Sequence, residues 1–328
     1  MPDPHQPDQP PVLDRLEETL LGGPRAYTRR QVAEQAGVPL ERAERLWRAL
    51  GFASVSDDEV VFGDSDVEAL STIASLVERG VVGADRLASV ARSLGQGMAR
   101  LADWQTTLLT ELGDDSDLMP GSTPETVAVA GELVPQIERL QSYVWRRHLL
   151  AAAVRVMPVA AEDPTSDTMV AGFADIVGFT TLSRSISEED LAALVERFEG
   201  TTAGIIAEHR GRVVKTIGDE VLFTVPRPTD AADIALALMA WTEADDDLPP
   251  LRIGMAYGRA ISSLGDVYGP MVNVASRLTS VARPGSAVVD RDLAAKLEDE
   301  PGYSLRRIRR VSVRGYSHLE PWVLRSSG

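Results

Sequence analysis

The alternation of strands and helices after Thr168 constrains the fold of this chain more than any other feature of its sequence. From this residue onward, apolar segments typical of buried strands alternate with segments of helical periodicity. In order they give a strand, a helix, a two-stranded hairpin, a helix and a strand, which is the βαββαβ unit of a ferredoxin-like palm. The sequence therefore predicts an α+β domain over residues 168–328.

The individual elements of this domain can be assigned from local signals. Ser187 is expected to cap the first helix, because Asp190 three residues later completes a capping-box pattern. The turn of the hairpin falls at Gly218 and Asp219. The expected strands are 168–174, 212–217, 220–225, 251–257, 287–289, 303–313 and 322–324, and the expected helices include 229–241, 270–281 and 291–297.

The first half of the chain has a different pattern. Residues 1–12 are rich in Pro and Asp and are predicted to be a disordered tail. Apolar residues then recur at three- and four-residue spacing, so we expect an all-α domain over 13–132. Residues 133–167 are interpreted as a linker helix followed by a polar hinge. The 4-3-4 spacing of apolar residues in this helix is typical of helices that pair across a dimer.

Residues 27–52 resemble a helix-turn-helix, with Thr28 as the cap of the first helix and Gly37 at the turn. Two interpretations follow: an element that binds DNA, or a pair of helices that pack inside a regulatory bundle. The second is preferred because the domain is acidic. The arginines that would favour DNA are Arg29, Arg30, Arg42, Arg45 and Arg48.

The composition excludes several classes of protein. Cysteine is absent, which removes disulfide scaffolds, thiolate metal sites and cysteine nucleophiles and fits a cytoplasmic protein. No segment approaches the roughly 18 apolar residues of a membrane span, and the first residues lack the pattern of a signal peptide. A formal net charge of −16 makes non-specific nucleic-acid binding an unfavourable interpretation.

Two acidic residues occupy positions for which a purely structural role is hard to find. Asp175 ends an apolar strand, and Asp219 lies in the hairpin turn. In a ferredoxin-like sheet these two segments are neighbours, so we expect the carboxylates to converge. Close carboxylates repel each other unless cations intervene, and their hard oxygens suit Mg²⁺ or Mn²⁺. The nearby loop with Gly178 and Thr180 offers backbone N–H groups for a triphosphate.

Three segments of this region, 173–180, 215–220 and 265–277, resemble the three signatures of the class III nucleotidyl cyclases. They read Phe-Ala-Asp-Ile-Val-Gly-Phe-Thr, Lys-Thr-Ile-Gly-Asp-Glu and Gly-Asp-Val-Tyr-Gly-Pro-Met-Val-Asn-Val-Ala-Ser-Arg. They occur in the family's order, and the resemblance covers residues 168–325. It implies a palm-type catalytic domain that works as a homodimer, with active sites built from both chains.

The resemblance also implies roles for single residues. Asp175 and Asp219 would bind two catalytic Mg²⁺ or Mn²⁺ ions, with the carbonyl of Ile176 as a further ligand. Lys215 would donate to adenine N1, and Asp266 would accept from the exocyclic amine. Guanine presents a carbonyl at that position, and family members that act on GTP tend to carry glutamate and a small polar residue instead.

A second group of residues would complete the site. Asn273 and Arg277 lie four residues apart on one helical face. The resemblance implies that Asn273 orients the ribose and that Arg277 stabilises the pentavalent transition state. Arg314 stands where the family often has a basic residue that touches the phosphates. The loop in contact with substrate would consist of Gly178, Phe179 and Thr180.

The sequence thus predicts an adenylyl cyclase that converts ATP to 3′,5′-cyclic AMP and pyrophosphate under control of the N-terminal domain. Small molecules, lipids and protons are the candidate inputs. His148, which follows Arg146 and Arg147 on the linker helix, is the candidate proton sensor because histidine titrates near neutral pH. Two alternatives stay open: a guanylyl cyclase, and a DNA-binding regulator that carries a cyclase-like module.

Overall fold

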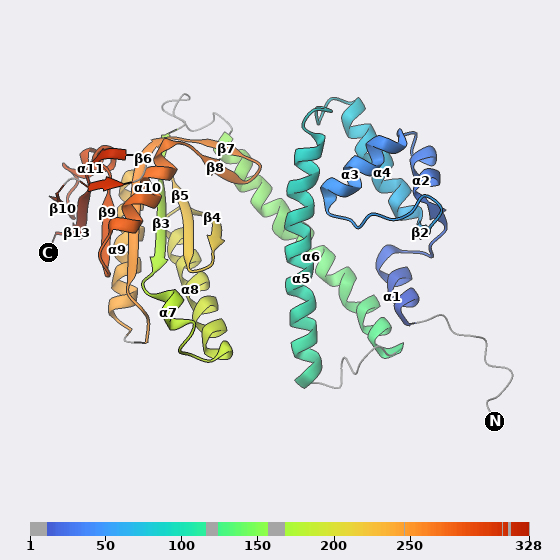
Figure 1. Cartoon of the computed structure of the whole chain (residues 1–328), viewed down its shortest axis with the longest axis horizontal. Helices are drawn as coiled ribbons and strands as arrows, with labels where there is room; N and C mark the ends of the chain where they lie inside the picture. The colour runs from blue at the N-terminus through green and yellow to red at the C-terminus, as the bar shows by residue number, and fades with distance from the viewer. Residues whose placement is uncertain are drawn as a thin grey trace. The chain divides into compact units, whose positions relative to one another are not determined.

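A computed structural model of the chain describes residues 12–115, 124–156, 168–245, 247–309, 311–313 and 316–327. The chain divides into two compact units, Met1–Ala160 and Ala161–Gly328, and each has its own hydrophobic core. The helices and strands are numbered along the chain in Figure 1. None of the helices in these ranges combines the length and the apolar character that a membrane crossing requires.

The C-terminal unit is built on a seven-stranded sheet with the order β10-β13-β9-β6-β3-β5-β4. The strands β6, β3, β5 and β4 are antiparallel neighbours and form the predicted ferredoxin-like unit. Strand β9 adds parallel to β6, and β13 and β10 extend the sheet to its other edge. The bounds are β3 Thr168–Ile176, β4 Arg212–Ile217, β5 Glu220–Val225, β6 Leu251–Arg259, β9 Ser286–Val289, β10 Tyr303–Arg307 and β13 Trp322–Ser326.

Helices cover the two faces of this sheet unequally. On one face, here the three-helix face, α8, α9 and α11 bury the larger of the two clusters of core residues. Of the described helices, α10 packs on the other face, here the α10 face, against β6, β3 and β9. Ser187 caps α8 as predicted, its hydroxyl accepting the Asp190 N–H at 3.1 Å. The bounds are α7 Phe179–Leu182, α8 Glu188–Glu208, α9 Pro228–Glu243, α10 Pro270–Val281 and α11 Arg291–Leu297.

Period-two alternation along the strands sends neighbouring residues to opposite faces. On β3, Val170 and Ala174 join the three-helix cluster, while Ala171 and Phe173 join the cluster beneath α10. Close packing of α10 on β6 depends on Gly254, because a Cβ there would lie 2.1 Å from a backbone nitrogen of the helix. Neighbouring residues of one strand therefore face different environments.

Two hairpins outside the main sheet were not predicted. Strands β7 (Ile261–Ser263) and β8 (Asp266–Tyr268) pair with each other across a two-residue turn. Strands β11 (Val311–Val313) and β12 (Tyr316–Leu319) form another pair. The expectation of one strand over 303–313 is therefore wrong. Strand β10 ends at Arg307, and the next amide, of Ile308, donates to the carbonyl of Pro321 outside the ladder.

The N-terminal unit is mostly helical. Thr28 caps α2 as predicted, because its hydroxyl accepts the Gln31 N–H while the Gln31 side chain accepts the Thr28 N–H at 2.8 Å. Gly37 turns the chain at φ 66° between α2 and α3. The helices are α1 Val12–Leu21, α2 Arg29–Gln35, α3 Leu40–Leu50, α4 Asp64–Glu78, α5 Leu87–Asp115 and α6 Pro124–Val156.

The expectation that this unit contains helices alone is wrong in one detail. Strands β1 (Tyr27–Thr28) and β2 (Val60–Phe62) pair in an antiparallel ladder. Both are too short for a period-two pattern to reveal them. They bring Phe62 against Trp47 of α3, with ring centroids 4.9 Å apart.

Helix α6 contains Pro135 without interruption and includes most of the predicted linker. Large apolar side chains along its second half are exposed, and these are Leu140, Tyr143, Val144, Trp145, Leu149, Leu150 and Val154. His148 is exposed on the same stretch. The predicted tail up to residue 11 and the predicted hinge at 160–167 lie outside the described residues.

Candidate active site

Three charged side chains meet on the α10 face at one end of β3. Asp175 lies opposite Glu220 of β5 and opposite Arg252 of β6 in the strand register. Alternation along β3 places Asp175 on the same side as Ala171 and Phe173, which pack beneath α10. The end of β3 therefore presents a charged cluster on the face that carries α10.

Asp175 is held by an arginine that the sequence did not single out. The Arg252 Nε donates to Asp175 Oδ2 at 3.0 Å, and its Nη2 donates to the same oxygen. Burial raises the pKa of Asp175, the Arg252 guanidinium opposes this, and the charge of Asp219 adds to it. Because the guanidinium uses Oδ2, the other carboxylate oxygen is not engaged by Arg252.

The hairpin turn that carries Asp219 is tied to the end of β3. The N–H of Ile176 donates to the backbone carbonyl of Asp219 at 3.1 Å. Burial and the charges of Asp175 and Asp219 raise the pKa of Glu220 to about 7, while Arg252 opposes the shift. The structure thus brings together Asp175, Ile176 and Asp219, the three residues expected to ligate metal.

The donor set at this point fits a hard divalent cation. Carboxylate and carbonyl oxygens are the ligands that Mg²⁺ and Mn²⁺ prefer, and Mg²⁺ usually combines one or two carboxylates with substrate phosphates and waters. Within the described ranges, no group of three or more His, Asp or Glu side chains is arranged to hold a metal alone. A cation here would therefore depend on Asp175, Asp219, a backbone carbonyl and the substrate.

A β-bulge sets the direction of Lys215. In the β4–β5 ladder Val213 lies opposite Phe223, but Lys215 lies opposite Leu222, so Val214 is the extra residue. Phe223 packs on the three-helix face and Leu222 on the α10 face. Because a bulge shifts the alternation by one residue, Lys215 shares the α10 face with the Asp175 cluster.

Lys215 binds the second residue expected to read the base. Its Nζ lies 2.6 Å from Oδ2 of Asp266, the first residue of β8. The other oxygen of Asp266 accepts the N–H of Val267 at 2.8 Å. The hydrogen bond from Lys215 holds the pKa of Asp266 below its usual range. Asp266 is therefore a carboxylate at neutral pH, and it can only accept hydrogen bonds.

The remaining predicted residues are placed separately. Asn273 is exposed and Arg277 half-buried on α10, and in the described part of the chain neither side chain has a hydrogen bond or ion pair. Gly178 turns the chain at φ 76° before α7. Phe179 packs against the three-helix cluster, and Thr180 is exposed. Arg314 lies outside the described residues.

Arg252 and Glu220 are the site residues that the sequence analysis missed. Arg252 interrupts an otherwise apolar strand, one residue after its start. A charged residue inside an apolar strand could have been noticed from the sequence. Its partner could not be predicted, because the strand register sets Arg252 beside Asp175. Glu220 follows Asp219 directly and was quoted as part of the segment 215–220 without a role of its own. Both positions become informative only once β5 and β6 flank β3.

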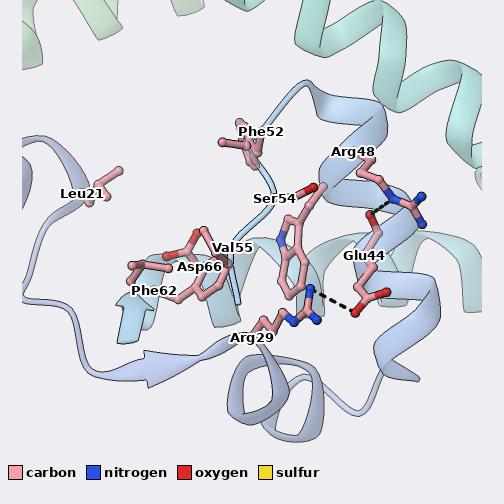
Figure 2. Close-up of a pocket in the computed structure, with 12 residues that line it drawn as sticks. Leu21, Arg29, Glu44, Arg48, Phe52, Ser54, Val55, Phe62 and Asp66 are labelled. Atoms are coloured by element: carbon pink, nitrogen blue, oxygen red, sulfur yellow. Dashed lines mark hydrogen bonds and ion pairs between the residues drawn. The ribbon is translucent and has the colours of Figure 1, made fainter. Parts of the chain in front are cut away.

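The N-terminal unit has a cavity of about 540 Å³ between α3 and β2. Figure 2 shows Phe62, Val55 and Phe52 around it, with Arg29, Glu44 and Arg48 on one side. The other lining residues are Leu21, Trp47, Ala53, Ser54, Val61 and Asp66. The walls combine aromatic rings with a few charged groups, which is typical of small-molecule pockets.

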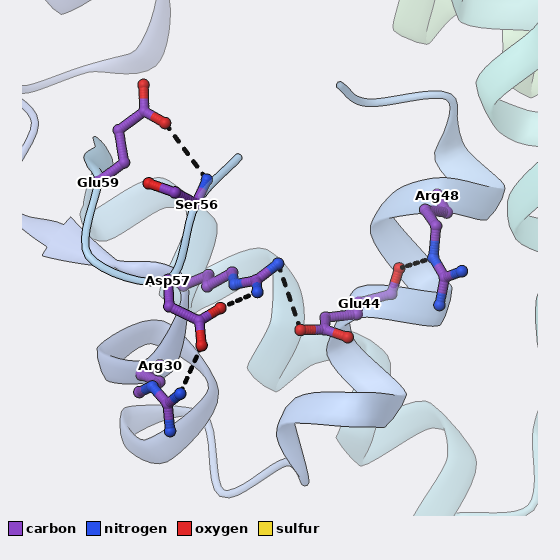
Figure 3. A network of polar contacts seen from close by, with 7 residues as sticks. Arg30, Glu44, Arg48, Ser56, Asp57 and Glu59 are labelled. Atoms are coloured by element: carbon purple, nitrogen blue, oxygen red, sulfur yellow. Dashed lines mark hydrogen bonds and ion pairs between the residues drawn. The ribbon is translucent and has the colours of Figure 1, made fainter. Parts of the chain in front are cut away.

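An ion network beside this cavity bears on the DNA interpretation. Arg29 pairs with Glu44 at 3.3 Å and also with Asp57, which pairs with Arg30 in turn (Figure 3). The Nε of Arg48 donates to the backbone carbonyl of Glu44 at 3.3 Å. Three of the five arginines that would contact phosphates, Arg29, Arg30 and Arg48, are thus engaged by groups of their own domain. This supports the interpretation of residues 27–52 as a packing unit.

Comparisons with known proteins identify the family of each unit. Residues 162–326 match the family described as the adenylate and guanylate cyclase catalytic domain, and residues 6–156 match the adenylate cyclase regulatory domain. The palm fold and the matched region define a nucleotidyl cyclase. A solved adenylyl cyclase from P. aeruginosa aligns with a TM-score of 0.43 at 22% identity, over 49% of this chain and 95% of that one.

Relatives that match almost the whole chain show which nucleotidyl cyclases this chain is similar to. An adenylate cyclase of Streptomyces coelicolor is 40% identical over 98% of this chain and 92% of its own length. An adenylate cyclase of Glutamicibacter nicotianae is 40% identical over 94% of this chain and 81% of its own length. A pH-sensitive adenylate cyclase of Mycobacterium tuberculosis is 34% identical over 92% of this chain and 77% of its own length. The chain belongs to the adenylate cyclases that join this regulatory domain to this catalytic domain.

Proposed function

We propose that the chain converts ATP to 3′,5′-cyclic AMP and pyrophosphate and selects adenine with Lys215 and Asp266. The observation that carries this proposal is their ion pair on the α10 face. A lysine can only donate and a carboxylate can only accept. Adenine N1 accepts and its exocyclic amine donates, whereas guanine has the opposite polarity at both positions. Each unpaired buried group costs about 1–3 kcal/mol, which favours ATP over GTP.

Asp175, Asp219 and the carbonyl of Ile176 are proposed to hold two Mg²⁺ or Mn²⁺ ions. When bound, such ions lower the pKa of the attacking hydroxyl and neutralise charge on the phosphates. Arg252 restrains Asp175 through Oδ2, which leaves Oδ1 for a cation. The backbone hydrogen bond between Ile176 and Asp219 keeps the turn beside the strand. The protein's part is thus to fix two carboxylates at one point.

The active site is proposed to form between two copies of the chain. Asn273 would orient the ribose and Arg277 would stabilise the pentavalent transition state, both from the copy opposite Asp175. Their lack of partners in the described part of the chain supports this assignment. The exposed apolar residues of α6 support pairing of the same two copies, because large apolar side chains exposed along a helix are typical of interaction surfaces.

Complementation tests the shared site. Asp175→Ala and Arg277→Ala are each expected to be inactive, while a mixed dimer contains one site with neither change. Mixing the two variants should restore activity to a substantial fraction of the wild-type value, and mixing Asp175→Ala with Asp219→Ala serves as a contrast. Asp175→Ala and Asp219→Ala affect the same half of the site, so that pair should stay inactive. If the mixture of Asp175→Ala and Arg277→Ala stays inactive while heterodimers are demonstrated, a shared site is contradicted.

The N-terminal domain is proposed to regulate catalysis within the cytoplasm. A small molecule or lipid would bind the cavity between α3 and β2, and protons would act at His148. The relative from M. tuberculosis that is named pH-sensitive supports a proton input.

The test of the proton input is the pH–rate profile of the full chain, of residues 160–328 and of His148→Gln. Identical profiles for the full chain and the fragment would contradict proton control, and an unchanged His148→Gln profile would exclude this residue.

Turnover of ATP and GTP decides the catalytic proposal. The purified full chain with Mn²⁺ should form cyclic AMP from ATP at a kcat/KM at least about a hundredfold above that for GTP, the ratio expected from two mispaired groups. Comparable turnover of both nucleotides would contradict base selection by Lys215 and Asp266. A preference for GTP would identify the chain as a guanylyl cyclase, the alternative that the sequence left open.

A further inference from the structure

We infer that Arg212 is a positioning residue for base recognition, because it anchors the turn that carries Asp266. Its Nη1 donates to the backbone carbonyl of Gly265 at 3.3 Å. Gly265 is the residue directly before Asp266, so the contact fixes the start of β8 relative to β4. The inference rests on the proposed reading of adenine by Lys215 and Asp266 and adds a residue to that function.

The bulge in β4 explains why Arg212 and Lys215 act on the same hairpin. Arg212 lies opposite Thr224 and Lys215 opposite Leu222, and both partners belong to one face of β5. Without the extra residue Val214, two positions three apart would point to opposite faces. Strand β4 therefore makes two contacts to the hairpin, one to the Asp266 side chain and one to the backbone preceding it.

The turn of the β7–β8 hairpin needs such an anchor. The hairpin forms a separate two-stranded ladder, and an isolated hairpin is marginally stable in water. Its turn residues Leu264 and Gly265 have φ values of 52° and 86°, and a leucine adopts that left-handed region only at a cost. The side chains of Ile261, Leu264 and Tyr268 are 70%, 56% and 55% exposed. Val267 of β8 is 3% exposed and packs in the cluster beneath α10, so apolar packing holds β8 after Asp266 but contributes little at the turn before it.

The backbone contact has a property that the ion pair lacks. When Lys215 donates to a purine, its bond to Asp266 is exchanged for a bond to the base. The hydrogen bond from Arg212 to Gly265 involves neither the base nor the Asp266 carboxylate, so it can persist through the exchange. Arg212 would thus keep the carboxylate at the distance that adenine requires while the side chains change partners.

The experiment measures base selectivity and hairpin mobility in the same variants of the full chain. Arg212→Ala should lower the ratio of kcat/KM for ATP to that for GTP about tenfold, the effect of one typical hydrogen bond. We expect this loss in KM for ATP, with kcat at saturating ATP within about twofold. Hydrogen exchange of the amides of residues 265–268 should become faster. Arg212→Lys keeps a donor and should restore part of both effects.

Arg307→Ala is the matched control. Arg307 also lies on an edge strand and binds one carboxylate, Glu320, at 2.9 Å, but it is at the β10 edge, opposite β4. This variant should change neither selectivity nor exchange at 265–268. Thermal unfolding of every variant identifies a fold defect. If Arg212→Ala is unstable, Arg212→Lys alone should still show a smaller loss of selectivity.

Asp266→Ala separates this inference from the function on which it rests. If Asp266→Ala abolishes the preference for ATP and Arg212→Ala leaves it intact, the positioning role is wrong and base reading stands. If Asp266→Ala retains the preference, base reading by Asp266 is wrong, and the positioning role fails with it. In the Asp266→Ala background, Arg212→Ala should have no additional effect on selectivity. An additional loss would overturn the inference, because Arg212 would then act by another route.

Discussion

The two faces of the catalytic sheet differ in what covers them and in what they carry. On the three-helix face, Phe223, Ile253 and Met255 are fully buried among apolar neighbours. On the α10 face, the same strands bury a second apolar cluster and also carry charges at one end, as Arg252 beside Ile253 shows. One alternating pattern thus supplies both a core and a site. A core residue and a site residue can therefore occupy adjacent positions on one strand.

Charged groups on the two faces are also compensated differently. On the three-helix side, Asp230 of α9 is 3% exposed and accepts two hydrogen bonds from Arg210, at 2.7 and 3.1 Å. On the α10 face, burial raises the pKa values of both Asp175 and Glu220 despite Arg252. Carboxylates whose charge is not fully compensated favour an added cation. The charge of Asp230 is thus paired within the chain, whereas the Asp175 cluster is proposed to be completed by a bound cation.

Removal of Asp175 should have the largest effect of any change to these two faces. Asp175→Ala is expected to reduce kcat at least about a thousandfold, because it removes a proposed metal ligand that contributes several kcal/mol of charge stabilisation. Stability should be little changed, since the side chain lies in a cluster of repelling carboxylates. Cyclic AMP formation with Mn-ATP and thermal unfolding measure the two quantities. Retention of more than about a tenth of the activity would contradict the metal assignment.

Exchange of the base-reading pair should have the next largest effect. Lys215→Glu combined with Asp266→Cys reverses the donor at one position and removes the acceptor at the other. The preference for ATP over GTP should fall about a hundredfold, since each mispaired group costs about 1–3 kcal/mol. The ratio of kcat/KM values for the two nucleotides is the measurement. An unchanged ratio in a folded double variant would mean that the purine is read elsewhere.

Much of the catalytic fold could be predicted because each element has a local signature. The turn Gly218-Asp219 and the β-rich runs around it gave the observed bounds of β4 and β5. The Pro270 start gave those of α10. Asp175 and Asp219 stood out because a carboxylate at the end of an apolar strand, or next to one, is unusual. These features depend on residues close together in the sequence.

The features that could not be predicted depend on partners distant in the sequence. Nothing local in β4 indicates that Val214 is an extra residue, because a bulge exists only relative to Phe223 and Leu222 of the neighbouring strand. The β7–β8 turn uses Leu264 in a conformation that leucine rarely adopts. The partnership of Arg252 with Asp175 requires the β3–β6 register. Register is set by the whole sheet, so these details required the structure.

A half-buried carboxylate on the three-helix side gives a smaller, pH-dependent effect on stability. Asp290 caps α11, and its Oδ1 accepts the N–H groups of Leu293 and Tyr257 at 2.9 and 3.2 Å. Burial raises the pKa of Asp290 to about 6 against these two bonds. The folded state therefore retains a proton that the unfolded state has lost. The free energy of unfolding contributed by this group falls as the pH rises from about 4 to about 6.

Asp290→Asn should remove that dependence while keeping the acceptor oxygen. The variant is expected to gain up to about 3 kcal/mol of unfolding free energy relative to wild type at pH 7. The gain should disappear near pH 4, where wild-type Asp290 is also neutral. Urea unfolding of both proteins across this range measures the difference. Asp290→Ala removes the same titration but also loses the cap, so it should be about 1 kcal/mol less stable than Asp290→Asn at every pH. A constant difference between Asp290→Asn and wild type would contradict the shift.

The smallest expected effect tests the separation of the two faces most directly. Ile253 is fully buried on the three-helix face, while the preceding residue, Arg252, binds Asp175 on the other. Ile253→Val removes one methylene group from the core and should lower the free energy of unfolding by about 0.5–1.5 kcal/mol. Because the backbone of β6 is held by strands on both sides, Arg252 should keep its position. The kcat of the folded variant should therefore equal that of wild type at 25 °C. A loss of kcat with the folded fraction unchanged would show that core packing on one face positions the charged cluster on the other.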